Sequence, residues 1–450
     1  MFRKNDVVDL RVDALGVDAQ GVCRYEGIVV FVAGALPGEH IRAMILSIKK
    51  NYAYAKLLDV LEPSPHRVTP PCPYFGRCGG CSCQHMDYAY TLEYKRGVVA
   101  QAMLKIAGVD SPVDNTLGME DPWQYRNKTA TPVQCSQGQA VTGFYAPRSH
   151  RLIRIKNCLI AMPPADDIAA VVRKWMEDNG VSAYDEATCK GDIRHVVSRA
   201  NRQGESMALL VVNCPKLPFE KELIRALIEG VPGIRSISYS VNTKHGNTIL
   251  GSDSAVVWGS ETLEETLCGI TFRVSPMSFF QVNPWQTEVL YKKALELAAP
   301  APNQTVADVY CGAGTIALCF APYVKDVVGV EIVPEAVSNA RVNAVANSIT
   351  NASFITGDAS QELPKLVSEG FRPDIVLLDP PRKGAPPEVL NSIVQAGPEK
   401  IVYISCHPAT QARDAAFLVQ HGYQVKSNSP VDMFCFTSGI ENIMLLTKEN

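Results

Sequence analysis

The stretch TVADVYCGAGTIALCFAPYVKDVVGVE, residues 305–331, decides the fold of the C-terminal part of the chain. It reads as an apolar strand, a glycine turn, a helix and a second apolar strand. From about residue 284 onward, strands and helices continue to alternate in this way. Such alternation is typical of a doubly wound parallel sheet with helices on both faces, so the sequence predicts a Rossmann-like α/β domain.

The whole chain has 450 residues, too many for a single hydrophobic core, so two or three domains are expected. Its composition, 46% hydrophobic and 20% charged, is that of an ordinary globular protein. The start, MFRKNDVVDL, lacks the apolar run of a signal peptide, and no apolar stretch is long enough to span a bilayer. The sequence therefore predicts a cytoplasmic protein with no membrane attachment. A net charge of −3 argues against a uniformly basic nucleic-acid binder but allows a local basic patch.

The first part of the chain shows a different pattern. Residues 1–61 read as short strands separated by glycine turns, which predicts a small all-β barrel. The prolines of EPSPHRVTPPCP break regular structure and mark a boundary near residue 62. Residues 62–90 and 112–270 mix strands with helices and predict a central α+β domain that begins with a cysteine-rich loop.

Glycine and acidic residues follow successive strands of the expected sheet at their carboxyl ends, where ligands bind in open α/β folds. Gly312 and Gly314 form a turn, which by itself is more often a tight connection than a ligand site. Glu331 ends the next strand where an acid would bind a ribose, Asp358 ends the third strand and DPPRKG (379–384) ends the fourth. A Walker-type lysine and a third packing glycine are both missing from the sequence. This order of motifs favours S-adenosylmethionine and predicts a class I methyltransferase.

Cys406 follows the apolar run 401–404 at the same edge of the expected sheet. A buried hydrophobe is the simpler interpretation of a free cysteine. A thiolate there has a chemical use, because C5 of uracil becomes nucleophilic only after a thiolate adds to C6. A base must then remove the C5 proton, and Glu441 is the best candidate, although a capping or surface glutamate is an equal alternative on position alone. Cytosine-5 RNA methyltransferases usually carry a second cysteine just after the D-P-P motif, and the segment DPPRKGAPPEVL has none, which favours uracil over cytosine.

Cysteines also cluster near residue 80. Fourteen cysteines in a large protein with no signal peptide are better explained as free, metal-bound or catalytic thiols than as disulfides. Cys72, Cys78 and Cys81 have the spacing C-x5-C-x2-C, and Cys83 is one candidate for a fourth ligand. Four thiolates suit zinc and a [4Fe–4S] cluster equally well, so the spacing alone leaves both open.

One basic segment stands out, because residues 126–156 contain no Asp or Glu. Its cations are Arg126, Lys128, Arg148, Arg151, Arg154 and Lys156, and the aromatic residues Tyr125, Phe144 and Tyr145 lie among or beside them. Cations interleaved with aromatic rings suit a single-stranded RNA groove, and a solvated strand face is the alternative. Lys49, Lys50 and Tyr52 form a second candidate in the barrel. Phe279 or Phe280 is a candidate to stack on a uracil swung out of its helix.

Eight motifs occur in the order found in one known family: GVCRYEGIVVFVAGALPGE, CPYFGRCGGCSCQH, SFFQVNP, DVYCGAGT, VVGVE, DPPRKG, YISCHPAT and VDMFCFTSGIE. On these motifs, nearly the whole chain resembles the RNA uracil-5 methyltransferase family. The closer likeness is to its branch with an N-terminal TRAM domain, an OB-like RNA-binding barrel, and a [4Fe–4S] cluster. The resemblance implies that 23S rRNA is the substrate in preference to tRNA, and the protein is expected to be a monomer.

The resemblance also assigns roles to residues. It implies that Cys406 is the attacking thiol and Glu441 the proton acceptor, and it adds Cys158 as the fourth ligand of a [4Fe–4S] cluster. It places residues 91–111 with residues 271–450 in the methyltransferase domain. The residues that it places at the cofactor or target base are Gln281, Tyr310, Gly312, Glu331, Asp358 and Asp379.

Two departures from the family pattern bear on activity. The family has S-C-N-P where this chain has Ser405–Cys406–His407–Pro408, and F-P-H-T where this chain has Phe434–Cys435–Phe436–Thr437. The histidine of H-[VL]-E before the glutamate is also replaced. These changes keep two rival interpretations open, an RNA-binding or RNA-folding protein with weakened catalysis and an amino-directed methyltransferase.

Overall fold

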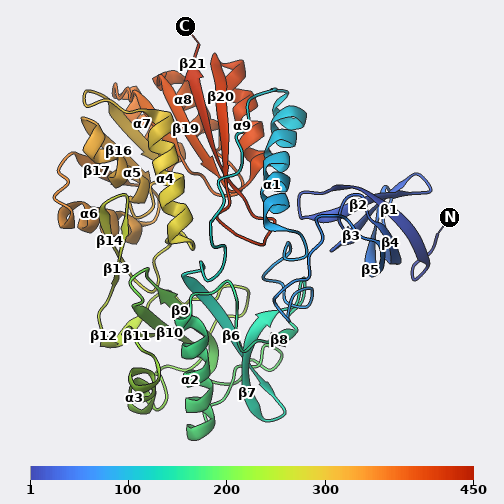
Figure 1. Ribbon diagram of the computed structural model, residues 1–450. Helices are drawn as coiled ribbons and strands as arrows, with labels where there is room; N and C mark the ends of the chain where they lie inside the picture. Colours follow the sequence, from blue (N-terminus) through green and yellow to red (C-terminus); the bar gives the residue numbers. More distant parts are fainter. Residues whose placement is uncertain (1, 450) are drawn as a thin grey trace.

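The computed structural model describes residues 2–449, which form a closed barrel followed by two seven-stranded sheets (Figure 1). The barrel strands are β1 (Val7–Leu15), β2 (Gln20–Tyr25), β3 (Ile28–Ala33), β4 (His40–Ile48) and β5 (Tyr52–Glu62), in the order β1-β2-β3-β5-β4. Along β1, inward Val8, Leu10 and Val12 alternate with more exposed residues, as a half-buried strand requires. The barrel therefore has its own small hydrophobic core.

The central sheet has the order β12-β11-β10-β9-β6-β7-β8. Its strands are β6 (Lys128–Ser136), β7 (Gln139–Tyr145), β8 (Leu152–Arg154), β9 (Ile193–Ala200), β10 (Ser206–Val212), β11 (Ile234–Val241) and β12 (Ala255–Gly259). Helices α2 (Pro164–Asn179) and α3 (Glu220–Gly230) pack on one face, where Val196 and Leu210 are buried. The other face buries Val197 and Leu209 beneath the segment that contains Met277. Each face of this sheet is thus buried by a different part of the chain.

The C-terminal sheet has the order β17-β16-β15-β18-β19-β21-β20. Its strands are β15 (Thr305–Val309), β16 (Asp326–Glu331), β17 (Ala352–Thr356), β18 (Ile375–Leu378), β19 (Lys400–Ser405), β20 (Tyr423–Val431) and β21 (Glu441–Lys448). The first five strands in this order are parallel, as predicted. The prediction was incomplete at one edge, because β21 runs antiparallel to both β19 and β20. A short connection after β20 returns the chain directly into a neighbouring strand, and only an antiparallel pair permits this.

Helices cover both faces of the C-terminal sheet. One face packs against α4 (Pro284–Ala298), α5 (Thr315–Phe320) and α6 (Pro334–Ala346), next to the hairpin of β13 (Leu263–Leu267) and β14 (Ile270–Val274). The other face packs against α7 (Ala359–Ser368), α8 (Pro387–Ala396) and α9 (Pro408–Gln420). A short 3-10 turn, η2 (Ala321–Tyr323), follows α5. Across residues 2–449, no helix has the length and apolar character needed to cross a membrane.

An upstream helix completes the second of these faces. Helix α1 (Tyr88–Ala102) continues into the π-helical turn η1 (Met103–Ala107) and ends at Gly108, which has a left-handed conformation. Val99 and Met103 are buried in the same hydrophobic cluster as residues of α7, α8 and α9. Figure 1 shows α1 beside β20 and α9, and its Tyr94 hydroxyl also contacts the barrel by accepting from the Ala19 N–H at 2.9 Å. The C-terminal sheet is therefore covered in part by a segment that lies before the central sheet.

Candidate active site

The antiparallel direction of β21 brings Cys406 and Glu441 to one place. Cys406 follows the last residue of β19, and Glu441 is the first residue of β21. The register pairs Ser405 with Asn442, so the next position on each strand places Cys406 opposite Glu441. This pair lies at the carboxyl edge of the parallel strands, where open α/β sheets bind ligands.

Burial and charge set the protonation of these two groups. Burial raises the pKa of the Cys406 thiol above 9.0, and the negative charge of Glu441 raises it further. Burial raises the pKa of Glu441 well above 4.5, and neighbouring Asp379 adds to that shift. Burial also raises the pKa of Asp379, to about 7. A raised pKa allows a carboxyl group to exchange protons with a substrate more readily than an ordinary, fully ionised one does.

Arg382 is a functional candidate that the sequence analysis missed. A hydrogen bond from its side chain and its positive charge both lower the pKa of Cys406, opposing burial. The same charge lowers the pKa of Glu441. The sequence does contain a signal for a functional role, because Arg382 lies within the DPPRKG motif, three residues after Asp379. The arginine therefore stabilises the thiolate form of Cys406.

The glycine turn after β15 is tied to the acid that ends β16. The Gly312 N–H donates to Glu331 Oε2 at 3.0 Å, and the Val333 N–H donates to Oε1 at 2.9 Å. Tyr310 has a φ of 77°, a left-handed conformation that is unfavourable for a bulky residue and is tolerated where function demands it. The structure thus holds Glu331 and the glycine turn in one rigid unit.

Asp358 has a structural contact of its own. It caps α7, with Oδ1 accepting from the Ser360 N–H at 2.9 Å and from the Ser360 hydroxyl at 2.7 Å. These hydrogen bonds lower the pKa of Asp358. The side chain remains exposed, so its second oxygen is available to a ligand.

Gln281 lies in the segment that joins the central and C-terminal sheets. Its carbonyl accepts a hydrogen bond from Asn127 Nδ2 at 3.0 Å, and its side chain is half-buried. Of the two neighbouring phenylalanines, Phe280 is buried against Phe272 whereas Phe279 is 79% exposed. Only Phe279 is therefore free to stack on a base.

His407 has a clear role at the place where the family has asparagine. It is the N-cap of α9, and its ring Nδ1 accepts a hydrogen bond from the Thr410 N–H at 3.3 Å. An asparagine side chain makes the same kind of contact at an N-cap. The substitution therefore preserves the start of the helix that follows Cys406.

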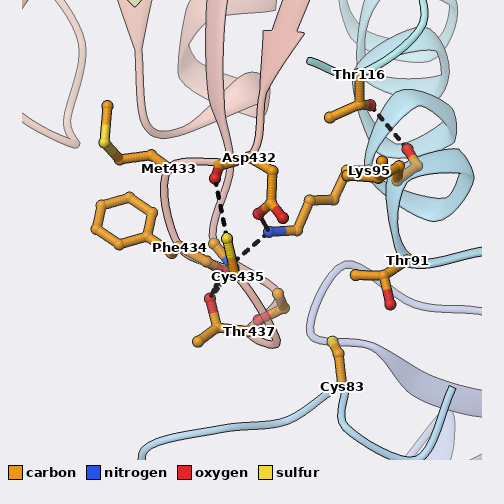
Figure 2. Close-up of polar contacts among 12 residues, drawn as sticks. Cys83, Thr91, Lys95, Thr116, Asp432, Met433, Phe434, Cys435 and Thr437 are labelled. Carbon is orange, nitrogen blue, oxygen red and sulfur yellow. Dashed lines mark hydrogen bonds and ion pairs between the residues drawn. The ribbon is translucent and has the colours of Figure 1, made fainter. Parts of the chain in front are cut away.

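The connection between β20 and β21, here the hairpin loop (residues 432–440), is held by the cysteine loop (residues 72–83). The Ser82 and Cys83 N–H groups both donate to the Phe436 carbonyl at 2.9 Å. Phe436 stacks on Trp123, with ring centroids 4.0 Å apart. Figure 2 shows Lys95 reaching Asp432 and the Phe434 carbonyl from the other side. Phe436, one of the residues that depart from the family pattern, is thus a packing residue of this joint.

The four cysteines predicted to bind a metal line one cavity of about 290 Å³. They are Cys72, Cys78, Cys81 and Cys158. Cys83, the alternative fourth ligand, is fully buried and does not line this cavity. Over the residues that the structure describes, no group of three or more His, Cys, Asp or Glu side chains is placed to hold a metal ion. The thiols are near neighbours, because Cys158, Cys78 and Cys72 each contribute to the raised pKa of Cys81.

Comparison with known proteins supports the predicted family. The family model for tRNA (Uracil-5-)-methyltransferase matches residues 259–449. An uncharacterized RNA methyltransferase of Clostridium tetani is 43% identical over 446 residues, which cover 99% of this chain and 97% of the relative. A second one, of Halalkalibacterium halodurans, is 42% identical over 449 residues, 99% of this chain and 98% of the relative. These relatives span essentially the full length of the chain.

A solved structure supports the fold. The tRNA (uracil-54, C5)-methyltransferase of Pyrococcus abyssi, in complex with S-adenosyl-L-homocysteine, has a TM-score of 0.78 at 24% identity. The match covers 98% of this chain and 100% of that chain. It confirms the predicted fold of a small N-terminal barrel and a Rossmann-like methyltransferase domain. The chain belongs to the RNA uracil-5 methyltransferase family and is an S-adenosylmethionine-dependent RNA (uracil-5-)-methyltransferase.

Proposed function

We propose that this enzyme forms 5-methyluridine in 23S rRNA, in the cytoplasm, with Cys406 as the nucleophile and Glu441 as the base. The observation that carries the proposal is the register of β19 and β21, which sets Cys406 opposite Glu441 beside the cofactor edge. A purely structural cysteine is not usually placed where a buried carboxylate, Glu441, and a guanidinium, Arg382, both shift its pKa.

Each group has one task in the proposed mechanism. The Cys406 thiolate, stabilised by Arg382, bonds to C6 of uracil and makes C5 nucleophilic. S-adenosylmethionine, when bound, supplies the methyl group that C5 takes. Glu441 then removes the C5 proton, the C6–S bond breaks and Cys406 leaves as a thiolate. The bond to Cys406 is broken again and Glu441 releases its proton to solvent, so the cycle regenerates both side chains.

We assign the cofactor to the edge next to this pair. Glu331, held by the glycine turn, suits the ribose hydroxyls, and Asp358 has an oxygen free for the adenine amino group. Gln281, Tyr310 and Asp379 complete the proposed site with Gly312. This placement puts the cofactor and Cys406 along one edge of the same sheet.

We also propose that the four cysteines around the 290 Å³ cavity hold a [4Fe–4S] cluster. Thiolates are the ligands that such clusters take. Four sulfurs on one zinc ion would lie about 3.8 Å apart around it, because each Zn–S bond is about 2.3 Å long. The four thiols line one cavity, and the resemblance to the family favours a cluster over zinc. Bound there, the group would brace the cysteine loop, which contacts the hairpin loop before Glu441.

RNA is proposed to contact three surfaces. The barrel, as a TRAM domain, offers Phe31, Tyr52 and Tyr54, whose rings lie 5.5–5.9 Å apart. Arg148 of the basic segment lies over the Tyr54 ring at 5.5 Å, so the barrel and the central sheet offer one continuous surface. Exposed Phe279 is the proposed stacking partner of the flipped uracil. A monomer suffices, because one chain carries every residue named.

The deciding experiment maps 5-methyluridine in total RNA from cells with and without the gene. Loss of one or more 5-methyluridines from 23S rRNA is expected, and complementation with wild-type but not Cys406→Ala protein should restore them. Loss from tRNA alone would replace the ribosomal assignment. Unchanged RNA modification together with normal RNA binding would instead favour a non-catalytic RNA-binding protein.

A further inference from the structure

Two cations face each other in the central sheet, and the part of the chain that the structure describes gives them no counter-charge. Lys128, at the start of β6, is the register partner of Arg199 in β9. Directly opposed residues of an antiparallel pair point to the same face of a sheet, so the two side chains are neighbours. Within residues 2–449, no carboxylate contributes to the pKa of either group, whereas Arg199 lowers the pKa of Lys128. The pair is therefore a local concentration of uncompensated positive charge.

Arg199 is the more unusual of the two. Its side chain is buried, with 4% of its surface exposed. Nη2 donates to the Ser278 carbonyl at 2.6 Å, while Nε and Nη1 are buried and have no hydrogen-bond partner among residues 2–449. Proteins almost never bury an arginine unless it is paired, because an unpaired charge loses its hydration without compensation. Arg199 thus has two nitrogens, Nε and Nη1, whose N–H groups need an acceptor. Because the guanidinium is positively charged, we expect that acceptor to be an anion.

The pair lies directly under the segment that is proposed to bind the target base. Ser278, whose carbonyl contacts Arg199, precedes exposed Phe279. Asn127, the residue before Lys128, donates from its N–H to the Val282 carbonyl at 2.8 Å. Any anion bound by Lys128 and Arg199 would therefore sit within a few residues of Phe279 and Gln281.

We propose that Lys128 and Arg199 bind a backbone phosphate of the RNA next to the target uridine. This inference rests on the proposed function, since RNA is the polyanion that must reach this segment. Phosphate oxygens accept charge-assisted hydrogen bonds from guanidinium and ammonium groups, and Arg does so in a bidentate manner. Because the two free nitrogens of Arg199 are closed to solvent, the phosphate must displace the Ser278 carbonyl. Phosphate binding is thereby coupled to the position of Phe279.

The test measures RNA affinity as a function of salt for Lys128→Met and Arg199→Met proteins. The probe is unmodified 23S rRNA made by transcription. Matched controls are Lys221→Met and Arg225→Met, which remove the same charges from α3, across the sheet from the pair. We expect each test variant to bind about tenfold more weakly. The slope of log K against log salt should fall by about 0.7 for each phosphate that a variant no longer binds, and the controls should keep the wild-type slope.

Melting temperature separates this role from a structural one. Replacing a buried, unpaired cation by an apolar side chain of similar size is often stabilising, so Arg199→Met should melt at or above the wild-type temperature. Arg199→Lys, which keeps the charge, should keep most of the salt slope. An unchanged affinity and slope in both Met variants would overturn the proposal. So would a loss of affinity for S-adenosylmethionine at normal RNA affinity, which would assign the anion to the carboxylate of the cofactor.

The same samples keep the two proposals separate. Formation of 5-methyluridine by the wild-type protein reports on the proposed function, whereas the salt slope of the Met variants reports on the phosphate site. A wild-type protein that binds RNA with the predicted slopes but never methylates it would refute the function alone. A methylating protein whose Met variants match the controls would refute the site alone.

Discussion

Lys95 of α1 and Asp432, the residue after β20, form an ion pair in which both side chains are completely buried. Their separation in sequence is 337 residues. Both groups have a further partner, since Lys95 Nζ also donates to the Phe434 carbonyl at 3.1 Å and the Tyr88 hydroxyl donates to Asp432 Oδ2 at 2.7 Å. This network joins an upstream helix to the hairpin loop that leads to Glu441.

Removing Lys95 alone should be strongly destabilising, because it leaves Asp432 buried without a counter-charge. We expect Lys95→Met to lower the free energy of unfolding by about 3–5 kcal/mol, measured by urea denaturation. The double variant Lys95→Met/Asp432→Leu should recover most of that loss, since no buried charge remains. A single variant as stable as the wild type would show that the pair contributes little to folding.

Replacing the nucleophile should abolish chemistry and spare the cofactor. Cys406→Ala should form no 5-methyluridine and no covalent adduct with RNA that contains 5-fluorouridine, while its affinity for S-adenosylmethionine stays within about twofold of wild type. Adduct formation is read as a shifted band on a denaturing gel. Cys135→Ala, at an exposed position of β6, is the matched control and should behave like wild type. A Cys406→Ala protein that still methylates uracil would refute the assignment.

Replacing Glu441, the proposed base, should block a later step of the reaction than replacing Cys406, the proposed nucleophile. In Glu441→Gln the thiolate can still add to C6 and C5 can still be methylated, but the C5 proton is not removed. Turnover should fall by about 10²–10⁴, and a covalent RNA adduct should accumulate. Denaturing gels with labelled unmodified RNA measure this, with exposed Glu369→Gln as the control. Slow turnover without any adduct would assign Glu441 to an earlier step.

The reactivity of Cys406 should depend on pH in a direction set by its two charged neighbours. Its pKa is raised above 9.0, so the rate of alkylation by iodoacetamide should still be rising at pH 9. Arg382→Met should move the profile to higher pH, because a group that lowers the pKa is lost. Glu441→Gln should move it to lower pH, because a negative charge is lost. Mass spectrometry of the Cys406 peptide follows each rate, and profiles that coincide would show that neither group acts on the thiol.

Deprotonation of Lys128 should make the folded protein measurably more stable as the pH rises into the alkaline range. Its pKa is about 8 in the folded protein, against 10.5 for an ordinary lysine, because of burial and the charge of Arg199. The unfolded chain therefore binds more protons between pH 8 and 10.5, and this group makes stability rise with pH across that window. The difference in unfolding free energy between wild type and Lys128→Met should change in the same window. A constant difference would mean that Lys128 titrates normally.

Local patterns in the sequence determined much of the fold. The run 305–331 predicted its strands, glycine turn and helix, because apolar periodicity and glycine act over short distances. The five parallel strands followed from the same reasoning. The order of Gly312, Glu331 and Asp379 along the chain identified a methyltransferase, since parallel strands carry their carboxyl ends to one edge of the sheet. The family resemblance, now confirmed by relatives of full length, rests on these short motifs.

Only the tertiary structure decided which distant residues meet. The antiparallel insertion of β21 between β19 and β20 sets Glu441 opposite Cys406, and nothing in the local sequence encodes that order of strands. Burial likewise separated exposed Phe279 from packed Phe280. Among the described residues, it also left Arg199 beside Lys128 with no counter-charge. Periodicity and motif order are properties of neighbours in the chain. Register, burial and charge balance arise only when segments hundreds of residues apart pack against one another.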